Sequence, residues 1–308
     1  MPVTTTSLNT IIIPAAGKGK RMRPATKITA KELLPVYDRL VIDFAIDEAI
    51  AAGAARIIVV VSKDKPGIRQ FLGNSVTESP ASAHAKGKDH ASVEVVYVTQ
   101  DEPKGLGHAI LCCRDQILPG PVGVILPDDI IMGSPCLSDM ARNYTAGHMI
   151  AAMEVAEHHT PHYGIFSLCG SGGGVCVPVT GMVEKPSIGQ APSTLAAVGR
   201  YILHPMIFDV LERTPKGAGD EVQLTDAIAI AARSVPLVAF RFTGTRHDCG
   251  CHDGLISASV ARQAEVKACR TSKPPSIVRT APCSMMNGTA NGAQDGEVFG
   301  AVRAGRFG

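Results

Sequence analysis

The segment that could do the most distinctive chemistry follows the first apolar run of the chain, in "IIIPAAGKGKRMRPATK". Its two closely spaced glycines let the backbone approach a ligand and point N–H groups at it. The same stretch is rich in basic residues, namely Lys18, Lys20, Arg21, Arg23 and Lys27. Lysine offers phosphate a point charge and arginine a planar fork of donors. The loop is therefore suited to a polyanion, although a solvated basic turn would have the same composition.

Three further motifs contain groups that a bound nucleotide would need. "QDEPKGLGHA" places Gln100, which could read the edge of a base, ahead of a glycine turn. "LPDD" ends an apolar run in Asp128, and "VEKP" sets Glu184 beside Lys185. Lys31, in "AKELLP", adds another cation. A carboxylate at a strand end that faces a triphosphate is by charge and hardness a Mg²⁺ ligand.

Two familiar phosphate-binding loops do not fit the opening segment. A P-loop requires G-x-x-x-x-G-K-[ST], but Arg21 follows Lys20 here, and no glycine lies five residues before Gly19. A dinucleotide fingerprint requires a third glycine where this chain has Met22, and an acid where the second expected strand ends in Ser62. A dinucleotide oxidoreductase is therefore disfavoured. The remaining interpretation is a loop that wraps a nucleoside triphosphate.

The elements that must position these groups can be read from hydrophobic periodicity. Continuous apolar runs predict strands buried on both faces at 10–16, 56–62, 93–99 and 121–129. Apolar residues at helical spacing predict helices between them at 41–53 and 105–117. This alternation predicts an α/β fold with a mixed, mostly parallel central sheet flanked by helices, similar to a Rossmann fold. Such sheets bind ligands at the carboxyl ends of their strands, where the glycine loop and Asp128 would lie.

The second half of the chain has a different pattern. Expected strands, hairpins and helices lie at 149–156, 158–186, 195–204, 205–214 and 221–234. We therefore expect a single domain over 1–262, with a nucleotide-binding half at 1–145 and a smaller, β-rich half at 146–262, which the family resemblance given below implies to be sugar-binding. Residues 263–308 lose periodicity and gain Pro, Gly, Ser and Asn, which predicts a poorly ordered C-terminal tail.

Composition narrows the possible partners. The net charge of the 308 residues is +2, they include no tryptophan, and only 4% are aromatic, so a nucleic acid partner is not expected. No apolar run approaches the roughly 20 residues of a spanning helix, and the first residues do not resemble a signal peptide, so we expect no membrane partner. Nine cysteines without CxxC spacing favour reduced thiols and a cytoplasmic location.

Taken together and in order, the motifs from about residue 10 to 262 resemble those of the bacterial UTP–glucose-1-phosphate uridylyltransferases, within the sugar-phosphate nucleotidyltransferase superfamily. The matching pieces are "PAAGKGKRMRPATK", "KELLPV", "VIDFAIDEAIAAG", "KGLGHAILC", "VILPDD", "YGI", "GMVEKP", "VGRYIL", "TPKGAGDEVQLTDAI" and "HDCG". "GAGDEVQLTDAI" and "HDCG" together distinguish this branch from the related thymidylyl- and cytidylyltransferases.

The resemblance implies a role for particular residues. It assigns binding of uracil, ribose and phosphates to Ala15, Ala16, Gly17, Gly19, Lys20, Gln100 and Gly105. It assigns neutralisation of the reacting phosphates to Arg21, Lys31 and Lys185, and the sugar pocket to Gly164, Glu184 and Val198. It assigns the binding of Mg²⁺ to Asp128, and it identifies Asp248 as a second acid that binds metal.

The implied reaction is Mg²⁺-dependent transfer of a uridylyl group from UTP to glucose 1-phosphate, which gives UDP-glucose and pyrophosphate. The attacking phosphate is already ionised at neutral pH, so no general base is expected. His108 is expected to pack on the nucleotide loop. The resemblance also implies a homo-oligomer, either a dimer or a tetramer. Two alternatives remain open: the same chemistry with another sugar 1-phosphate or nucleotide, and a non-catalytic paralogue that binds nucleotide sugars.

Overall fold

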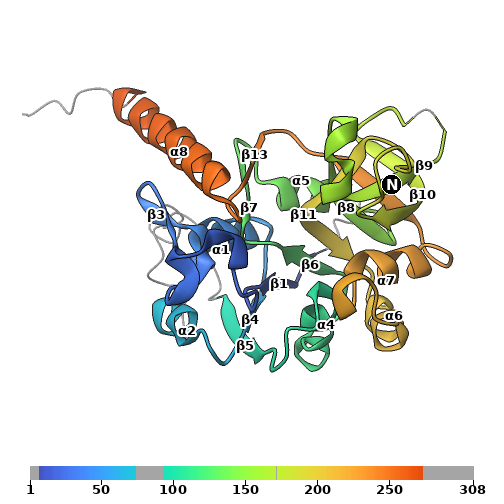
Figure 1. Ribbon diagram of the computed structural model, residues 1–308, viewed down its shortest axis with the longest axis horizontal. Helices are drawn as coiled ribbons and strands as arrows, with labels where there is room; N and C mark the ends of the chain where they lie inside the picture. Colours follow the sequence, from blue (N-terminus) through green and yellow to red (C-terminus); the bar gives the residue numbers. More distant parts are fainter. Residues whose placement is uncertain (1–6, 74–92, 171, 273–308) are drawn as a thin grey trace, which may run out of the picture.

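A computed structural model describes residues 7–73, 93–170 and 172–272; it has a central sheet with helices packed against it (Figure 1). The main strands are β1 (Thr10–Pro14), β4 (Arg56–Val61), β5 (Glu94–Thr99), β6 (Val122–Ile125), β8 (His148–Glu154), β9 (Gly164–Leu168), β10 (Cys176–Glu184), β11 (Leu195–Leu203) and β12 (Leu237–Arg241). The α-helices are α1 (Val41–Ala51), α2 (Pro66–Leu72), α4 (Leu106–Leu111), α5 (Cys136–Asn143), α6 (Ile207–Arg213), α7 (Leu224–Ala231) and α8 (His252–Ser272). Two small sheets pair β2 (Pro35–Val36) with β3 (Arg39–Leu40), and β7 (Asp129–Met132) with β13 (Thr245–Asp248).

The nine main strands form one sheet in the order β5-β4-β1-β6-β11-β8-β12-β10-β9. Strands β5, β4, β1 and β6 are parallel to their neighbours within this group. Beyond β6 the directions change: β11 is antiparallel to β6 and β8, β12 is parallel to β8, and β10 is antiparallel to β12 and β9. The alternating strands and helices predicted for the first half are confirmed.

The predicted mostly parallel sheet is wrong, because its second half is largely antiparallel. The physical reason is that a continuous apolar run shows burial on both faces, which holds for strands of either direction. The second half of the chain shares this sheet with the first half. Its strands extend the sheet of the first half through the pairing of β11 with β6.

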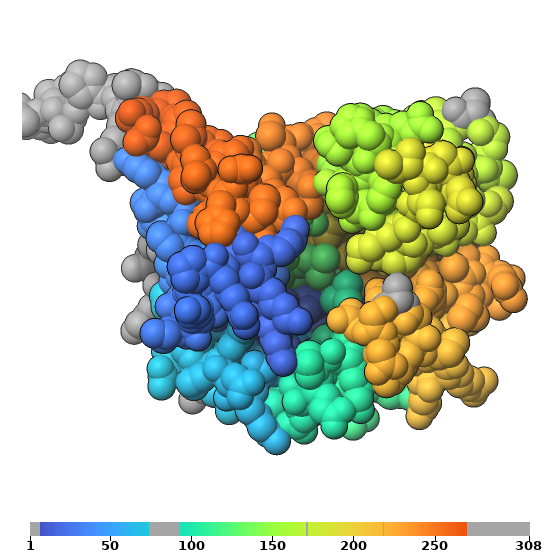
Figure 2. Space-filling model, viewed as in Figure 1, coloured from blue at the N-terminus to red at the C-terminus, as the bar shows by residue number. Residues whose placement is uncertain are grey.

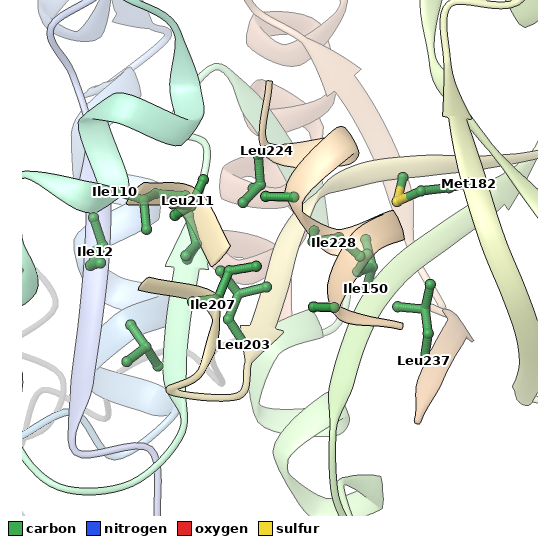
Figure 3. Packing of buried hydrophobic residues seen from close by; sticks show 14 of the residues in the cluster. Ile12, Ile110, Ile150, Met182, Leu203, Ile207, Leu211, Leu224, Ile228 and Leu237 are labelled. Carbon is green, nitrogen blue, oxygen red and sulfur yellow. The ribbon is translucent and has the colours of Figure 1, made fainter. Parts of the chain in front are cut away.

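The core consists of two apolar layers, one on each face of the sheet. Because side chains alternate along a strand, Ile12 of β1 enters one layer, and Ile11 and Ile13 enter the other. Figure 3 shows the first layer, where Ile12 and Ile150 of the sheet meet residues of the helices α4, α6 and α7. The second layer is formed with residues of α1 and α5. Burial on both faces is the reason that these strands read as unbroken apolar runs.

Helix α8 projects from the body of the molecule (Figure 1). Its base packs through Ala258 on a small cluster that includes Val36, Ile130 and Cys249. The poorly ordered tail was predicted from residue 263, but residues 263–272 are helical. Residues 263–269 are mostly exposed, so they have no apolar period, and helix-forming residues such as Glu, Lys and Ala extend the helix by propensity. Residues 273–308 lie outside the described part.

In the described part of the chain, none of the helices has the length and apolar character that crossing a bilayer requires.

Candidate active site

A cleft of about 520 Å³ lies at the carboxyl ends of β1, β5 and β6. It is lined by Pro14, Ala16, Gly17, Lys18, Gly19, Lys20, Lys31, Gln100, Pro103, Gly105, Leu106, Ala109, Leu126, Asp128 and Glu221. Figure 2 shows a hollow on this face, between the N-terminal segment in blue and later segments in yellow-green and orange. The cleft therefore lies where parallel strands bring the loops after them together.

Most residues predicted to hold the nucleotide lie in this lining: Ala16, Gly17, Gly19, Lys20, Gln100 and Gly105, with Lys31 and Asp128 beside them. Ala15 is different, because its side chain is fully buried in the core layer that faces α1. Sequence reasoning missed Leu106, Leu126 and Glu221. Leu106 and Leu126 give no signal in a sequence, because isolated leucines are ordinary core residues.

The glycine loop is held in a tight turn. Gly19 has a φ of 60°, in the left-handed region that favours glycine. A Cβ at this position would lie 3.1 Å from Cγ2 of Thr26, whose hydroxyl donates to the carbonyl of Gly19 at 2.7 Å. The loop then enters a short 3₁₀ turn over Lys20–Met22, which is anchored by the buried side chain of Met22. Lys20 and Arg21 are thus held at the entrance of the cleft.

A buried ion pair supports this loop. The ammonium of Lys65 lies 3.1 Å from Oε2 of Glu32, which is fully buried. The same ammonium donates to the carbonyls of Ala15, at 3.4 Å, and Gly17. Burial raises the pKa of Glu32, against the effect of Lys65 and Lys31. Sequence analysis did not single out either partner, because Glu32 and Lys65 are charged residues of a kind that usually faces solvent.

The acidic corner of the cleft is formed by two loops. Lys31 forms an ion pair with Asp128, which follows β6, and Nη1 of Arg21 lies 3.3 Å from Oδ2 of Asp248, at the end of β13. Burial by itself would raise the pKa of Asp128, but Lys31 holds that pKa below its usual value. Burial likewise opposes the charge of Lys31, but Asp128 raises its pKa. Both groups therefore stay charged at neutral pH.

Gly250 brings the two carboxylates to the same space. A Cβ at Gly250 would lie 2.9 Å from Oδ2 of Asp128, 2.9 Å from Oδ1 of Asp248 and 2.4 Å from Nη2 of Arg21. A backbone hydrogen bond fixes the two loops to each other, since the N–H of Cys249 donates to the carbonyl of Asp128 at 2.7 Å. Only a residue without a side chain leaves room for a ligand among these three groups.

This donor set fits a hard divalent cation that is also bound by substrate. Within the described residues there is no group of three or more His, Cys, Asp or Glu side chains that could hold a metal ion without help. Two carboxylates facing one space still match Mg²⁺, which is commonly held by one or two carboxylates together with substrate phosphates. Asp128 and Asp248 are therefore suited to the role predicted for them.

Behind the acidic corner, Arg246 connects it to the second half of the chain. Its Nε donates to Oδ1 of Asp129 at 2.9 Å, and its Nη1 donates to the hydroxyl of Tyr163 at 3.1 Å. The other carboxylate oxygen of Asp129 accepts the N–H of Gly199 at 2.9 Å. Burial raises the pKa of Asp129, and this outweighs the opposing effect of Arg246. The sequence does not reveal this network, because its members are far apart in the chain.

The residues predicted for the sugar lie in a second group, next to Tyr163. Nζ of Lys185 lies 3.0 Å from Oε1 of Glu184, and the hydroxyl of Thr225 donates to Oε2 of Glu184 at 2.7 Å. Gly164 faces the same carboxylate, since a Cβ there would lie 3.3 Å from that oxygen. The N–H of Lys185 donates to the carbonyl of Tyr163 at 3.0 Å. Thr225 was missed by sequence reasoning.

Two predicted residues are placed differently from the rest of the set. Lys185 contacts Glu184 and does not contact the group of Arg21, Lys31 and Asp128. The side chain of Val198 packs in the core, where it is only 1% exposed, so the side chain itself does not face the cleft. Because side chains alternate along β11, this position faces the α1 side of the sheet, and only its backbone remains for a ligand.

A buried ion pair holds the loop that carries Asp128. Arg200, 1% exposed, donates through Nε to Oε2 of Glu48 at 2.9 Å. Its Nη1 donates to the carbonyl of Leu126 at 3.2 Å. Glu48 of α1 also accepts the N–H of Leu137 at 2.9 Å. The pair thus connects α1, α5 and β11 to the end of β6, two residues before Asp128.

Comparison with known proteins agrees with this architecture. The sheet with a cationic, carboxylate-bearing cleft at its parallel strand ends is that of a nucleotidyl transferase, and the family model named "Nucleotidyl transferase" matches residues 10–265. A UTP–glucose-1-phosphate uridylyltransferase of Staphylococcus haemolyticus is 41% identical over 81% of this chain and 90% of its own length. The enzyme of the same name from Escherichia coli K12 is 37% identical over 84% of this chain and 92% of its own.

Solved structures show the same likeness. A UDP-glucose pyrophosphorylase complexed with UDP-glucose has a TM-score of 0.75 and 34% identity, and the match covers 84% of this chain and 99% of that one. A UTP-bound enzyme of Acinetobacter baumannii has a TM-score of 0.73 and 32% identity, and covers 87% of this chain and all of that one. This chain belongs to the nucleotidyl transferase family, as a member of its UTP–glucose-1-phosphate uridylyltransferases. The resemblance drawn from the motifs is thereby confirmed.

Proposed function

We propose that this protein transfers a uridylyl group from UTP to α-D-glucose 1-phosphate and releases pyrophosphate. The observation that carries the proposal is the space above Gly250, where Asp128, Asp248 and Arg21 converge at the end of a cleft lined by the glycine loop and Gln100. The relatives of this chain are named for the same reaction. The residues that surround the cleft thus combine a place for a base with a place for phosphates and a cation.

The chemistry requires no proton shuttle. An ionised phosphate oxygen of glucose 1-phosphate attacks the α-phosphorus of UTP and forms a new P–O bond. The bond between the α-phosphorus and its bridging oxygen breaks in line, and that oxygen leaves with pyrophosphate. The second pKa of a phosphate monoester is about 6, so the attacking oxygen is already ionised at neutral pH. Catalysis then consists of positioning and electrostatic stabilisation.

The chain's own cations offset the repulsion between the two substrates. Lys20 and Arg21 would face the phosphates that leave, and Lys31 would face the α-phosphate beside Asp128. Asp128 and Asp248 would hold Mg²⁺, which when bound supplies positive charge to the phosphate oxygens. Glu184, oriented by Thr225, would accept hydrogen bonds from glucose hydroxyls, with Gly164 leaving room for the ring. Lys185 would approach the phosphate of the sugar from this side.

The same proposal assigns one substrate to each half of the domain. Residues 1–145 would bind the nucleotide and residues 146–262 the sugar, with Arg246 joining Asp129 of the first to Tyr163 of the second. We also propose that the protein acts in the cytoplasm as a homo-oligomer, either a dimer or a tetramer. Light scattering coupled to size-exclusion chromatography would measure the mass, and a monomer at micromolar concentration would refute the oligomer.

The test is incubation of the purified protein with UTP, Mg²⁺ and a panel of sugar 1-phosphates, scored for pyrophosphate release. We expect release with glucose 1-phosphate that exceeds release with galactose, mannose or N-acetylglucosamine 1-phosphate, and none in the presence of EDTA. A parallel panel of CTP, ATP, GTP and TTP with glucose 1-phosphate tests the nucleotide. Release with another sugar or another nucleotide, but not with this pair, would overturn the proposal. Binding of UDP-glucose without any release would identify a non-catalytic binder.

A further inference from the structure

We propose that His108 is a positioning residue: it locks the amide of Gln100 so that the cleft selects uracil, which presents a ring N–H, over cytosine, which presents a ring acceptor. This inference rests on the proposed nucleotide site, because it deepens that site's choice of base. Its basis is a set of contacts at the inner end of the cleft, between β5 and α4, which neither the fold nor the phosphate chemistry requires.

The amide of Gln100 is held at two points. Gln100 is 6% exposed, follows β5 and lines the cleft. Its Nε2 donates to the carbonyl of Gly105 at 3.1 Å and lies 2.9 Å from Nδ1 of His108. An amide nitrogen has two hydrogens and accepts nothing, so Nδ1 of His108 must be the acceptor. The imidazole is therefore neutral, with its hydrogen on Nε2.

These two contacts exclude the flipped amide. Were the amide reversed, Oε1 would face the carbonyl of Gly105, and two acceptors would confront each other. The carbonyl of Gly105 cannot change its role, and neutral His108 reinforces the same choice. With both hydrogens of Nε2 engaged, Oε1 is the one polar atom of the amide for which the described residues offer no hydrogen-bond partner. Gln100 thus presents Oε1, a hydrogen-bond acceptor, to a ligand.

An acceptor at this position discriminates between the two pyrimidines. Uracil carries a hydrogen on N3, which an amide oxygen can accept. Cytosine has a lone pair on N3, which would face the same oxygen and remain unpaired in a dry pocket. A buried polar group without a partner lowers affinity far more than a missing contact does. A Gln that was free to rotate would serve both bases, so discrimination depends on the lock.

The surroundings of His108 keep its imidazole neutral. Burial lowers its pKa, Lys104 lowers it further, and Glu102 opposes them. Its ring nitrogens also lie 3.8 Å and 3.9 Å from Sγ of Cys112, one helical turn further along the chain. Burial raises the pKa of Cys112, so this neighbour is an uncharged thiol. The lock therefore holds through neutral pH. In acid, Nδ1 gains a proton and becomes a donor, which opposes the Nε2 hydrogens and frees the amide.

The experiment measures binding, so it does not depend on turnover. UDP and CDP are titrated into the full-length protein by calorimetry, each over a pH range from 5 to 8 with Mg²⁺ present. At pH 7.5 we expect UDP to bind roughly ten times more tightly than CDP or better. We expect this ratio to fall towards one in the most acidic buffers.

Two variants distinguish a positioning role of His108 from a general disturbance of the structure. In His108→Ala this acceptor is lost and the carbonyl of Gly105 alone holds the amide, so we expect the ratio of affinities to fall several-fold at all pH values. In His108→Asn the Oδ1 can take the place of Nδ1 but cannot be protonated, so the ratio should return and stay constant with pH. The exposed His158→Ala is the matched control and should keep the wild-type ratio.

Each outcome tests a different part of the proposal. Equal binding of UDP and CDP by the wild type, or an unchanged ratio in His108→Ala, would overturn the role of His108. A ratio in His108→Asn no higher than that in His108→Ala would overturn the requirement for an acceptor at this position. If the ratios behave as expected but no UDP-glucose forms from UTP and glucose 1-phosphate, then the proposed function fails while this inference stands.

Discussion

Lys65 and the fully buried Glu32 form an ion pair, with 3.1 Å between Nζ and Oε2, behind the glycine loop. Because the ammonium of Lys65 also donates to the carbonyls of Ala15 and Gly17, this pair holds the backbone of the loop in place. A buried charge without its partner is strongly unfavourable. The loop's geometry is therefore tied to the stability of the fold.

The first prediction concerns this pair. Lys65→Met should leave Glu32 buried and unpaired and lower the free energy of unfolding by about 3–5 kcal/mol. The KM for UTP should rise, since the loop loses its anchor. The double variant Lys65→Met, Glu32→Leu should regain most of the stability, measured by urea denaturation, but should keep the raised KM. The exposed Lys63→Met serves as control. A normal KM in the double variant would show that Lys65 does not position the loop.

The second prediction concerns Gly250. Gly250→Ala would place a methyl group 2.9 Å from each carboxylate of the proposed cation site. Turnover should fall on the order of 10²-fold, because displacement by about 1 Å has effects of this size. Gly181→Ala is the control, since a Cβ there meets nothing within 4 Å. Full activity of Gly250→Ala in a pyrophosphate assay would show that phosphates and cation bind elsewhere.

The third prediction separates charge from shape at Asp128. Asp128→Asn should abolish turnover at any Mg²⁺ concentration, because the amide oxygen is a weak ligand for a hard cation. The melting temperature should change little, since an Asn oxygen can still accept from Lys31. The exposed Asp115→Asn should behave as the wild type in both measurements. A near-normal rate for the Asp128 variant would rule out the metal assignment.

The fourth prediction concerns the sugar side. Thr225→Val removes the hydrogen bond that orients Glu184, which is worth about 1 kcal/mol. The KM for glucose 1-phosphate should rise about fivefold, while the KM for UTP stays unchanged. Thr180→Val, which alters an exposed hydroxyl on β10, is the matched control. A change in the KM for UTP alone would place Glu184 on the nucleotide and not on the sugar.

The fifth prediction is a dependence of stability on pH. His148 is fully buried, and burial and then His204 lower its pKa to about 4. The unfolded chain binds the proton at about pH 6.5 and the folded chain does not, so stability is lost as pH falls from about 6.5 towards 4. By pH 5 the loss should reach about 2 kcal/mol. In His148→Asn, urea denaturation between pH 7 and 5 should lack this slope. An equal slope in both proteins would contradict the assignment.

The sequence was sufficient to predict the groups at the strand ends. Long apolar runs identified β1 and β4, because burial on both faces leaves no polar positions. The run at 93–99 also identified β5, but β5 is an edge strand whose residues are only partly buried, so its predicted burial on both faces is wrong. Gln100 and Asp128 could be predicted as site residues, because the carboxyl ends of neighbouring parallel strands meet at the same edge of a sheet. Their placement in one cleft follows from that rule and the order of the elements.

Other parts of the site required the tertiary structure. Val198 was predicted to line the sugar pocket; a strand's period of two places its side chain on the face that packs against α1, so only its backbone could contact a sugar. Arg246 and Tyr163 meet across 83 residues of chain, and no local pattern signals such a pair. The role of Gly250 depends on three side chains from distant loops converging on one point.

The sequence alone determined which chemical groups this protein possesses, and it determined the family, because local motifs in a set order carry both. The fold decided the direction of the second half's strands, the burial of Glu32 beneath the glycine loop and the orientation of the Gln100 amide. These features depend on contacts between residues far apart in the chain. Their energies come from burial and hydrogen-bond geometry, which exist only once the chain is folded.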